Sequence, residues 1–238
     1  MRRLKMNEMS KQERLELLEL YKDVRVADVR DGMDLYMMHY FGSMDPSIRP
    51  LFRTKAFGIA KTARYLPFQG PIPAGSQEAY LEWEGRYYTD VCSYPWEAEI
   101  QDGDFVALDL SGVNVGLMGS FNGLMDFSNG ARGFVVNGGA RDTDELVLQK
   151  IPFWCLMTCH GMVQGRIQYD SHNVPIAIGG VVIFPGDVIV ADGDGVIVVP
   201  RKIAFEVGKK AVSQLGGDKK ARKRLYEKMG WELDNTVI

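Results

Sequence analysis

Apolar positions near the start of the chain recur three or four residues apart, and this spacing predicts two helices before the first strand. Over residues 10–21, Ser10 is a good N-cap and Glu13 follows three positions later, as in a capping box. Residues 26–40 show an imperfect helical period and are predicted to form the second helix. Two X-Pro pairs within residues 45–50 then end the helical pattern.

The middle of the chain alternates short apolar strands with helices. Residues 65–80 are rich in proline and glycine and are predicted to form a long loop, which at this length is typical of a functional or partner-contacting segment. The helix that follows carries Tyr80, Trp83, Tyr87 and Tyr88, which we expect in the core or at a subunit interface rather than in a ligand cage. The predicted strands are 57–64, 105–110, 134–136 and 151–157, with a further short strand before residue 119, and the predicted helices are 78–88, 120–129 and 145–149.

The segment 181–200 has the strongest β pattern, because two runs of β-branched residues flank an Asp-Gly-Asp-Gly sequence at 192–195. This sequence has the look of a calcium loop, but the later ligands and the glutamate of an EF-hand do not follow it, so we predict a hairpin turn. Helices are predicted at 201–214 and 219–229, the second with a basic, solvated face. Together the elements indicate one α/β layered domain with a mixed sheet and helical additions at each end.

Composition limits the classes of function. The chain has 238 residues, of which 46% are hydrophobic and 25% charged, as expected for a globular protein with a substantial core. The net charge of -3 argues against nucleic acid as the main partner, because phosphate binding needs a concentrated basic surface. Three irregularly spaced cysteines indicate a reducing compartment. The polar segment 1–5 and the lack of any run of about 18 apolar residues predict a cytoplasmic protein with no membrane span.

Residues 133–142 form the first candidate site. Residues 134–136 are predicted to be a buried strand that runs into a glycine pair and ends at Arg141 and Asp142. A cation beside an anion at a strand end, with small residues that let another molecule approach the backbone, is a common way to build a site. A surface ion pair after a glycine-rich turn accounts for the same residues.

A second candidate is a metal site at Cys155, Cys159 and His160. The Cys-x3-Cys-His spacing lacks a second pair of ligands, which makes it a weak signal for zinc. Buried thiols on a strand account for the cysteines more simply, so we expect no metal there.

These pieces together resemble the RraA-like family over about residues 26–207. That family includes class II pyruvate aldolases such as 4-hydroxy-4-methyl-2-oxoglutarate aldolase, and the RraA regulators of ribonuclease E. The most specific shared feature is Gly119, which lies 22 positions before Arg141 of an Arg-Asp pair that acidic residues soon follow. The other segments that carry the resemblance are 48–52 with 58–62, the predicted helix to Gly130, the stretch 133–142, and 184–200.

The resemblance implies a layered β/β/α fold of the swivelling type in a single domain 1–238. The core would cover about 26–207, with helical additions at 8–25 and 201–230. Family members are trimers or hexamers with sites between subunits, so a homotrimer or homohexamer is expected.

The resemblance also implies roles for individual residues. Asp142 would hold a divalent metal, Mg²⁺ or Mn²⁺, and Arg141 would contact a small 2-keto acid substrate and stabilise its developing enolate. Backbone amides of the loop after the early glycine would receive the pyruvyl carboxylate, at Ser120, Phe121, Asn122 and Gly123. These roles agree with the chemistry of a hard cation, a fixed guanidinium and a helix N-terminus.

One position departs from the aldolase pattern. Aldolases of this family commonly carry an acidic residue directly after the early glycine, where it helps to transfer a proton, but this chain has Ser120. A hydroxyl can hydrogen-bond a water but cannot act as a base at neutral pH. Either another group moves the proton, or the reaction differs, or the activity is weakened. Asn122 and Asp126 are the nearest alternatives in sequence, and Asn137 is a second departure, at a position where an acidic residue is frequent.

Three functions fit these observations. The leading one is a metal-dependent lyase that cleaves a 4-hydroxy-2-keto acid by a retro-aldol reaction or decarboxylates oxaloacetate, through a pyruvate enolate. The second is a non-catalytic regulator that binds a protein partner such as ribonuclease E, and the third is another lyase or isomerase acting on a sugar-derived acid. Substrate specificity is expected in the loops 65–80 and 160–175, where the candidate contributors are His160, Arg166 and His172.

Overall fold

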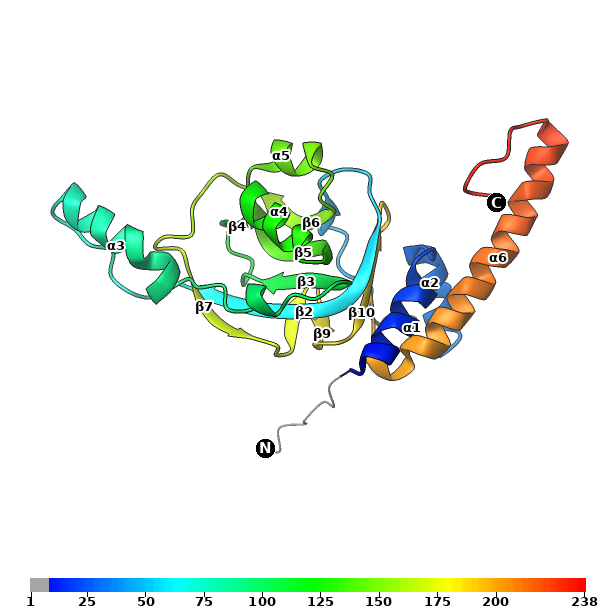
Figure 1. The fold of residues 1–238 in the computed structure, drawn as a ribbon, viewed down its shortest axis with the longest axis horizontal. Helices are drawn as coiled ribbons and strands as arrows, with labels where there is room; N and C mark the ends of the chain where they lie inside the picture. The colour runs from blue at the N-terminus through cyan, green and yellow to red at the C-terminus, as the bar shows by residue number, and fades with distance from the viewer. Residues whose placement is uncertain (1–8) are drawn as a thin grey trace.

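The computed structural model describes residues 9–238. The predicted polar segment 1–5 and residue 8, the first of the predicted helical addition, lie outside the described residues. The described chain forms a mixed sheet with the strand order β1-β6-β5-β3-β2-β10-β11, to which β4 adds beside β5 and β7 beside β2. Helices lie at both ends of the chain (Figure 1). The predicted α/β layered fold is therefore confirmed.

The strands are β1 (Arg49–Pro50), β2 (Ala56–Pro67), β3 (Asp104–Asp109), β4 (Gly116–Met118), β5 (Ala131–Ala140), β6 (Phe153–Thr158), β7 (Ile167–His172), β8 (Ile176–Ile178), β9 (Val181–Ile183), β10 (Val188–Asp192) and β11 (Gly195–Val199). The helices are α1 (Lys11–Tyr21), α2 (Val26–Asp34), α3 (Gln77–Asp90), α4 (Ser120–Ser128), α5 (Thr143–Leu148) and α6 (Ala204–Met229), with short 3-10 helices η1 (Glu97–Glu99) and η2 (Arg201–Ile203).

Strands β2, β3, β5 and β6 are mutually parallel where they pair, and both faces of this part of the sheet are covered. Val106 and Leu108 of β3 enter one core cluster, which includes Leu146 of α5. Phe105 and Ala107 point to the other face, into a cluster with the β8–β9 pair. Because successive strand residues face opposite sides, the continuous apolar runs seen in the sequence fill two cores at once.

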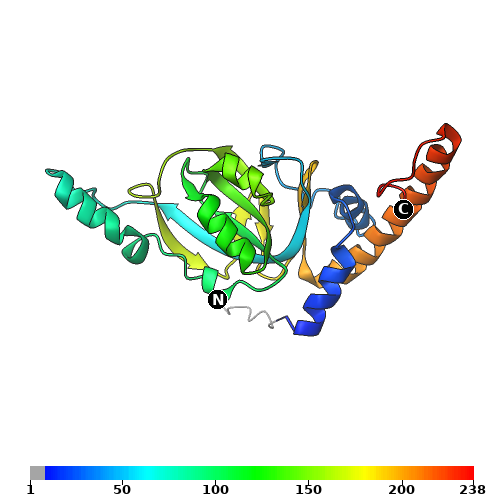
Figure 2. The ribbon, with the colours of Figure 1, turned by 45° about the horizontal axis from the view of Figure 1, so that its top comes forward.

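A third cluster joins α1, α2 and α6 to strands β10 and β11. The hydroxyl of Tyr21 donates to the carbonyl of Ala204 at 2.7 Å, and Arg201 pairs with Glu13 at 2.7 Å. These contacts fix the N-terminal and C-terminal helices against each other. Both views show the three helices at one end of the sheet, whereas α3 projects from the other end (Figures 1 and 2).

The C-terminal helix differs from the prediction. Two helices were predicted at 201–214 and 219–229, but α6 runs without interruption from 204 to 229, through Gly216 and Gly217. Asp218, just after the glycines, pairs with Arg222 one turn later and with Arg25 of the N-terminal region at 2.8 Å. Such contacts offset the low helix propensity of the two glycines.

Several boundaries also differ. The predicted loop 65–80 is shorter, because β2 continues to Pro67 by pairing with β7, a strand that was not predicted, and α3 begins at Gln77. The first β-branched run of 181–200 divides into β9 and β10, since the Asp187 carboxylate accepts the amide of Phe184 at 2.8 Å and turns the chain between them. The short strands β1 and β8 were also not predicted. Other elements are extended or truncated: β5 covers 131–140, the second helix ends at Asp34, and β6 begins at Phe153.

In the described part of the chain, no helix is both long enough and apolar enough to cross a membrane.

Candidate functional site

The candidate site forms where two neighbouring strands end. β4 pairs in parallel with the last residues of β5, Gly116 opposite Gly139 and Met118 opposite Ala140. The residues that follow each strand, Gly119 and the Arg141-Asp142 pair, therefore emerge at the same edge of the sheet. The amide of Arg141 continues the pairing by donating to the carbonyl of Met118 at 3.1 Å.

Asp142 lies between the end of β5 and the start of α5. It has φ 51° and ψ 43°, a left-handed conformation that is uncommon outside glycine but that aspartate tolerates. Its Oδ2 accepts the backbone amide of Ser120 at 3.3 Å, and its Oδ1 accepts Nε of Arg141 at 3.3 Å. The Asp142 side chain is 38% exposed, so the carboxylate is held in place and still open to a ligand.

Two glycines leave room for these side chains. A Cβ atom at Gly119 would lie 2.3 Å from Oδ2 of Asp142, and one at Gly116 would lie 2.7 Å from the Cβ, Cγ and Cδ atoms of Arg141. The stem of Arg141 thus rests on the backbone of Gly116. Sequence reasoning noted Gly119 but gave Gly116 no role, and only the register of β4 against β5 reveals it.

The N-terminus of α4 follows Gly119, which caps the helix without a side chain. The first amides of a helix have no partner within it, and here the amide of Ser120 is used by Asp142. The amide of Gly123 donates to the carbonyl of Gly119 at 2.9 Å. Of the four residues expected to bind the carboxylate, Phe121 and Asn122 are therefore the two whose amides remain open, with no hydrogen-bond partner among the described residues. Gly123 instead provides space, since a Cβ there would lie 2.9 Å from Leu146 of α5.

The two polar residues considered as alternatives near Ser120 have different positions. Asn122 is half-buried in the first turn of α4, close to the site. Asp126 is completely buried on the inner face of the same helix, where burial and then the charge of Glu97 raise its pKa to about 8. Asp126 thus points into the core, not toward Asp142.

Asn137, the second departure from the family pattern, lies in β5, where its side-chain amide donates to Asp109 of β3 at 3.1 Å.

The loop after β6 lies beside the site. The amide of Cys159 donates to Ala140 at 2.8 Å, and the amide of Gly116 donates to Gly161 at 3.0 Å, which brings His160 next to the strand ends. Arg166 packs against Gly161 and donates to backbone carbonyls of this loop.

His172 lies elsewhere, at the edge of the sheet in β7. Its Nδ1 is hydrogen-bonded to the Tyr169 hydroxyl at 2.5 Å, and its Nε2 contacts Glu99 at 3.3 Å. Lys61 pairs with the same glutamate at 2.5 Å, and this holds the pKa of Glu99 near 2. The structure therefore groups His160 and Arg166 near the site and separates His172 from them.

The alternative metal sites considered from sequence are not formed. Within residues 9–238, no group of three or more His, Cys, Asp or Glu side chains is arranged to hold a metal ion, and this includes Cys155, Cys159 and His160. Cys155 is buried on β6, as expected for a core thiol. In the segment 192–195, the amide of Asp194 donates to the Asp192 carboxylate at 2.8 Å across a two-residue turn, so the predicted hairpin is confirmed.

A hard divalent cation nevertheless fits the surroundings of Asp142. Mg²⁺ is usually held by one or two carboxylates, several waters and the substrate, not by a cage of protein ligands. Asp142 supplies one partly exposed carboxylate whose orientation is set by Ser120 and Arg141, and the missing Cβ of Gly119 keeps the space beside Oδ2 free. A Cys- or His-rich metal site does not fit, because those ligand types do not converge here.

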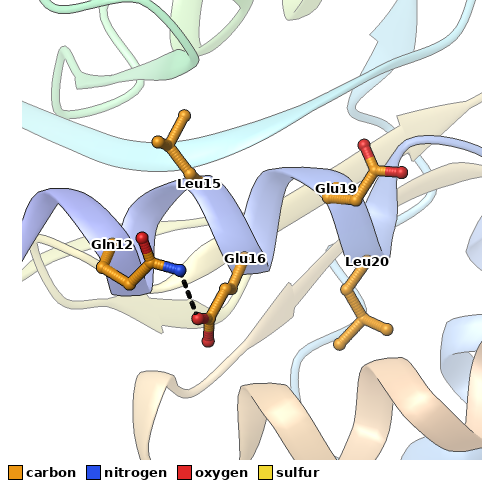
Figure 3. A pocket seen from close by; sticks show the side chains of 5 residues that line it. All are labelled: Gln12, Leu15, Glu16, Glu19 and Leu20. Atoms are coloured by element: carbon orange, nitrogen blue, oxygen red, sulfur yellow. Dashed lines mark hydrogen bonds between the residues drawn. The ribbon is translucent and has the colours of Figure 1, made fainter.

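Two hollows on the surface of the described chain lie away from this site. A shallow hollow of about 350 Å³ runs along α1, and no residue of the candidate site lines it. Figure 3 shows that its apolar side chains, Leu15 and Leu20, point to opposite sides of the helix, while Gln12 and Glu16 are hydrogen-bonded to each other at 2.6 Å. Its two carboxylates, Glu16 and Glu19, belong to no group of three or more His, Cys, Asp or Glu side chains that could hold a metal ion in the described residues.

The chain was also compared with known proteins. The model of a family described as RraA-like (Aldolase/RraA) matches residues 26–198. A protein of Halalkalibacterium halodurans, named provisionally as a 4-hydroxy-4-methyl-2-oxoglutarate aldolase, is 35% identical over 127 residues. This match covers 53% of the chain and 60% of the relative, so the chain spans less than two thirds of that relative's length.

Solved structures show the same fold. An uncharacterised protein of Pseudomonas syringae pv. tomato superimposes with a TM-score of 0.71 at 24% identity, over 94% of this chain and 98% of that one. RraAS2 of Streptomyces coelicolor, described as an unusual member of the RNase ES inhibitor RraA protein family, superimposes with a TM-score of 0.69 at 26% identity, over 87% of this chain and 96% of that one.

Proposed function

Since the chain belongs to the RraA-like family, we propose that it is a divalent-metal-dependent carbon–carbon lyase that acts on a 2-keto acid. The substrate would be a 4-hydroxy-2-keto acid cleaved by a retro-aldol reaction, or oxaloacetate cleaved by decarboxylation. Both reactions pass through the same pyruvate enolate. The observation that carries the proposal is the convergence of a carboxylate, a guanidinium and open helix amides at one edge of the sheet.

The open amides of α4 are suited to the substrate carboxylate. The N-H groups of Phe121 and Asn122 point out of the first turn, and the positive end of the helix dipole favours an anion there. The amide of Ser120 is already bound to Asp142, so the substrate carboxylate would lie beside that carboxylate, not on it. This arrangement would set the orientation of the keto acid.

Arg141 is suited to the negative charge that develops on the enolate oxygen. Its stem is fixed over Gly116, and its Nε is bound to Asp142, which leaves the terminal nitrogens to contact the substrate. A pre-oriented cation at the position of developing charge is typically worth about 2.7–4 kcal/mol, by analogy with one oxyanion-hole donor.

Asp142 would hold Mg²⁺ or Mn²⁺. When bound, such an ion supplies Lewis-acid polarisation of the 2-keto oxygen. Ser120 lies next to the carboxylate through its own backbone amide, and its hydroxyl can orient a water but cannot take up a proton at neutral pH. We propose that a water held by Ser120 and Asn122 passes the proton of the 4-hydroxyl to bulk solvent as the carbon–carbon bond breaks. A proton from solvent then adds to the enolate carbon to give pyruvate, and decarboxylation needs only this second transfer.

Pyruvate release tests the proposal. The full chain would be assayed with a panel of 4-hydroxy-2-keto acids and oxaloacetate, with Mg²⁺, with Mn²⁺ and with a chelator. We expect pyruvate from at least one substrate, and no pyruvate in chelator. No turnover of any substrate, together with no metal binding by calorimetry, would exclude a metal-dependent lyase.

A regulator that binds a protein partner is the second candidate function. The likeness to RraAS2, which is described as belonging to an RNase ES inhibitor family, favours it. Inhibition of a ribonuclease of the E type by the full chain, unchanged when Asp142 is replaced, would support a regulatory role that does not use the metal site. Sugar-derived acids added to the substrate panel test the third reading, a different lyase or isomerase.

A homotrimer or homohexamer is part of the proposal. The outer faces of α4 and α5, which border the site, expose large apolar side chains such as Phe121 at 75% and Leu148 at 80%. Sedimentation equilibrium of the full chain would measure the mass directly, and a monomer at all concentrations would contradict the proposed assembly.

A further inference from the structure

Two acidic side chains place carboxyl oxygens in the interior where, among the described residues, no hydrogen-bond donor reaches them. Asp126 of α4 is 0% exposed, and neither of its carboxyl oxygens has a hydrogen-bond partner in the described chain. Glu97 of η1 is half-buried, and its Oε1 is also buried without a partner. An unpaired carboxylate in such surroundings is costly, so these groups either carry a proton or disturb the packing around them.

Asp126 is central to the way α4 packs. The two fully buried residues of this helix are Gly123, which has no side chain, and Asp126. On the outer face, Phe121, Leu124 and Phe127 are all exposed. Asp126 is thus the one buried residue of α4 that has a side chain, in a helix of only nine residues whose first turn carries the open amides.

The groups around the two carboxyls do not compensate a negative charge. Glu97 is the charged group that acts on Asp126, and it raises the pKa of Asp126 further after burial has done so. Tyr65 of β2 and Tyr94 face Glu97, and burial raises the pKa of both phenols, so they are neutral at physiological pH. In the part of the chain that the structure describes, no lysine or arginine offsets the charge of either carboxyl.

We propose that the carboxyl groups of Asp126 and Glu97 form a pH-sensitive element that controls how firmly α4 is docked, and through α4 the amides at its N-terminal end. The regulatory consequence rests on the proposed function, in which those amides hold the substrate carboxylate. With both carboxyls protonated, α4 packs against the core beside η1. Loss of a proton leaves a charge that water can reach only when α4 moves outward.

Docking of α4 is therefore firmest at acidic pH and weakens as the pH rises. A carboxyl exposed by undocking has an ordinary pKa of about 4, whereas burial raises the pKa to about 8 for Asp126 and about 7 for Glu97. The docked form binds the proton more tightly. The ratio of undocked to docked molecules therefore rises about tenfold per pH unit for each group between these two pKa values. Above the raised pKa values the effect levels off.

Hydrogen exchange of the α4 amides tests this inference without substrate or metal. Protection factors of residues 123–128 in the full chain, corrected for the intrinsic pH dependence of exchange, should fall at least about 10²-fold between pH 5.5 and 8. Asp126→Asn should remove most of the fall, Glu97→Gln should make it shallower, and the double variant should abolish it. Asp90→Asn, which neutralises an exposed acid at the end of α3, should keep the wild-type slope.

Protection that does not change with pH in the wild-type chain, or that falls equally in Asp126→Asn, would overturn the inference. Asp126→Ala provides a second variant if the asparagine disturbs folding. The outcome is independent of the lyase assay. If the chain has no lyase activity but shows this pH dependence, only the proposed function is contradicted. If the chain is an active lyase whose α4 protection does not change with pH, only this inference is contradicted.

Discussion

The backbone amide of Ser120 donates a hydrogen bond of 3.3 Å to Oδ2 of Asp142, and this bond joins the start of α4 to the end of β5. Gly119 makes the approach possible, because a Cβ there would lie 2.3 Å from the same oxygen. We expect Gly119→Ala to displace Asp142 or α4 and to abolish metal binding and pyruvate release while the fold is kept. Calorimetry measures metal binding, the pyruvate assay measures turnover, and circular dichroism checks that the fold is kept. Gly85→Ala in α3, where no atom lies within 4 Å of the new Cβ, should leave both activities unchanged.

Asp142→Asn should remove metal binding while keeping an acceptor for the amide of Ser120. The amide side chain matches the carboxylate in shape but lacks the charge that a hard cation prefers. Titration calorimetry with Mn²⁺ should show no heat, and residual pyruvate release should no longer respond to metal or chelator. Activity with an unaltered metal response would show that Asp142 is not the ligand.

Arg141→Lys should reduce kcat/KM about 10²–10³-fold, by analogy with the loss of one oxyanion-hole donor. Lysine keeps the charge but loses the planar fork that both binds Asp142 and reaches the substrate. Metal binding should change little, since the carboxylate remains. Arg86→Lys, on the exposed surface of α3, is the matched control, and a decrease of the same size there would show that the loss at Arg141 is not specific to the site.

Ser120→Asp should raise the cleavage rate if proton transfer limits the reaction. The new carboxylate would stand beside Asp142 at a position where a base can orient and deprotonate water. Rates measured from pH 3 to 8 should show a new ionisation near the ordinary carboxyl range, about 4. An unchanged or lower rate with intact metal binding would show that another group already moves the proton.

Glu99→Gln should lower stability at neutral pH and lower it less as the pH falls toward 2, where Glu99 becomes protonated in the folded chain. Lys61 holds the pKa of Glu99 near 2, below its usual 4.5. A depressed pKa contributes stability above the unfolded value, and this contribution is lost as the pH falls from 4.5 toward 2. The side chain is 46% exposed, so solvent screening limits the loss to about 0.2–1 kcal/mol.

Denaturant titration at pH 7 and pH 3 measures the effect of Glu99→Gln. Glu232→Gln, an exposed glutamate near the C-terminus, is the control and should show no difference between the two pH values. Equal destabilisation of Glu99→Gln at both would contradict an electrostatic origin.

The sequence alone predicted those elements whose strand and turn residues are adjacent in the chain. The β-branched runs around 192–195 specify a hairpin because turn chemistry and strand propensity lie in adjacent residues. By contrast, β7 contains Gln168 and Asp170 and shows little strand pattern, and it becomes a strand because it pairs with the end of β2. The continuity of α6 through Gly216 and Gly217 likewise depends on a partner 193 positions away, since Asp218 binds Arg25.

The sequence by itself determined the α/β class, the helices at both ends and the family resemblance, because these depend on residue types and their spacing. It also singled out Gly119, Arg141 and Asp142. Only the tertiary structure decided that Arg141 rests on Gly116, that the amide of Gly123 is used within α4, and that Asp126 faces the core. The physical reason is that these three facts depend on the register of β4 against β5 and on the rotation of a short helix, and neither is encoded by neighbouring residues.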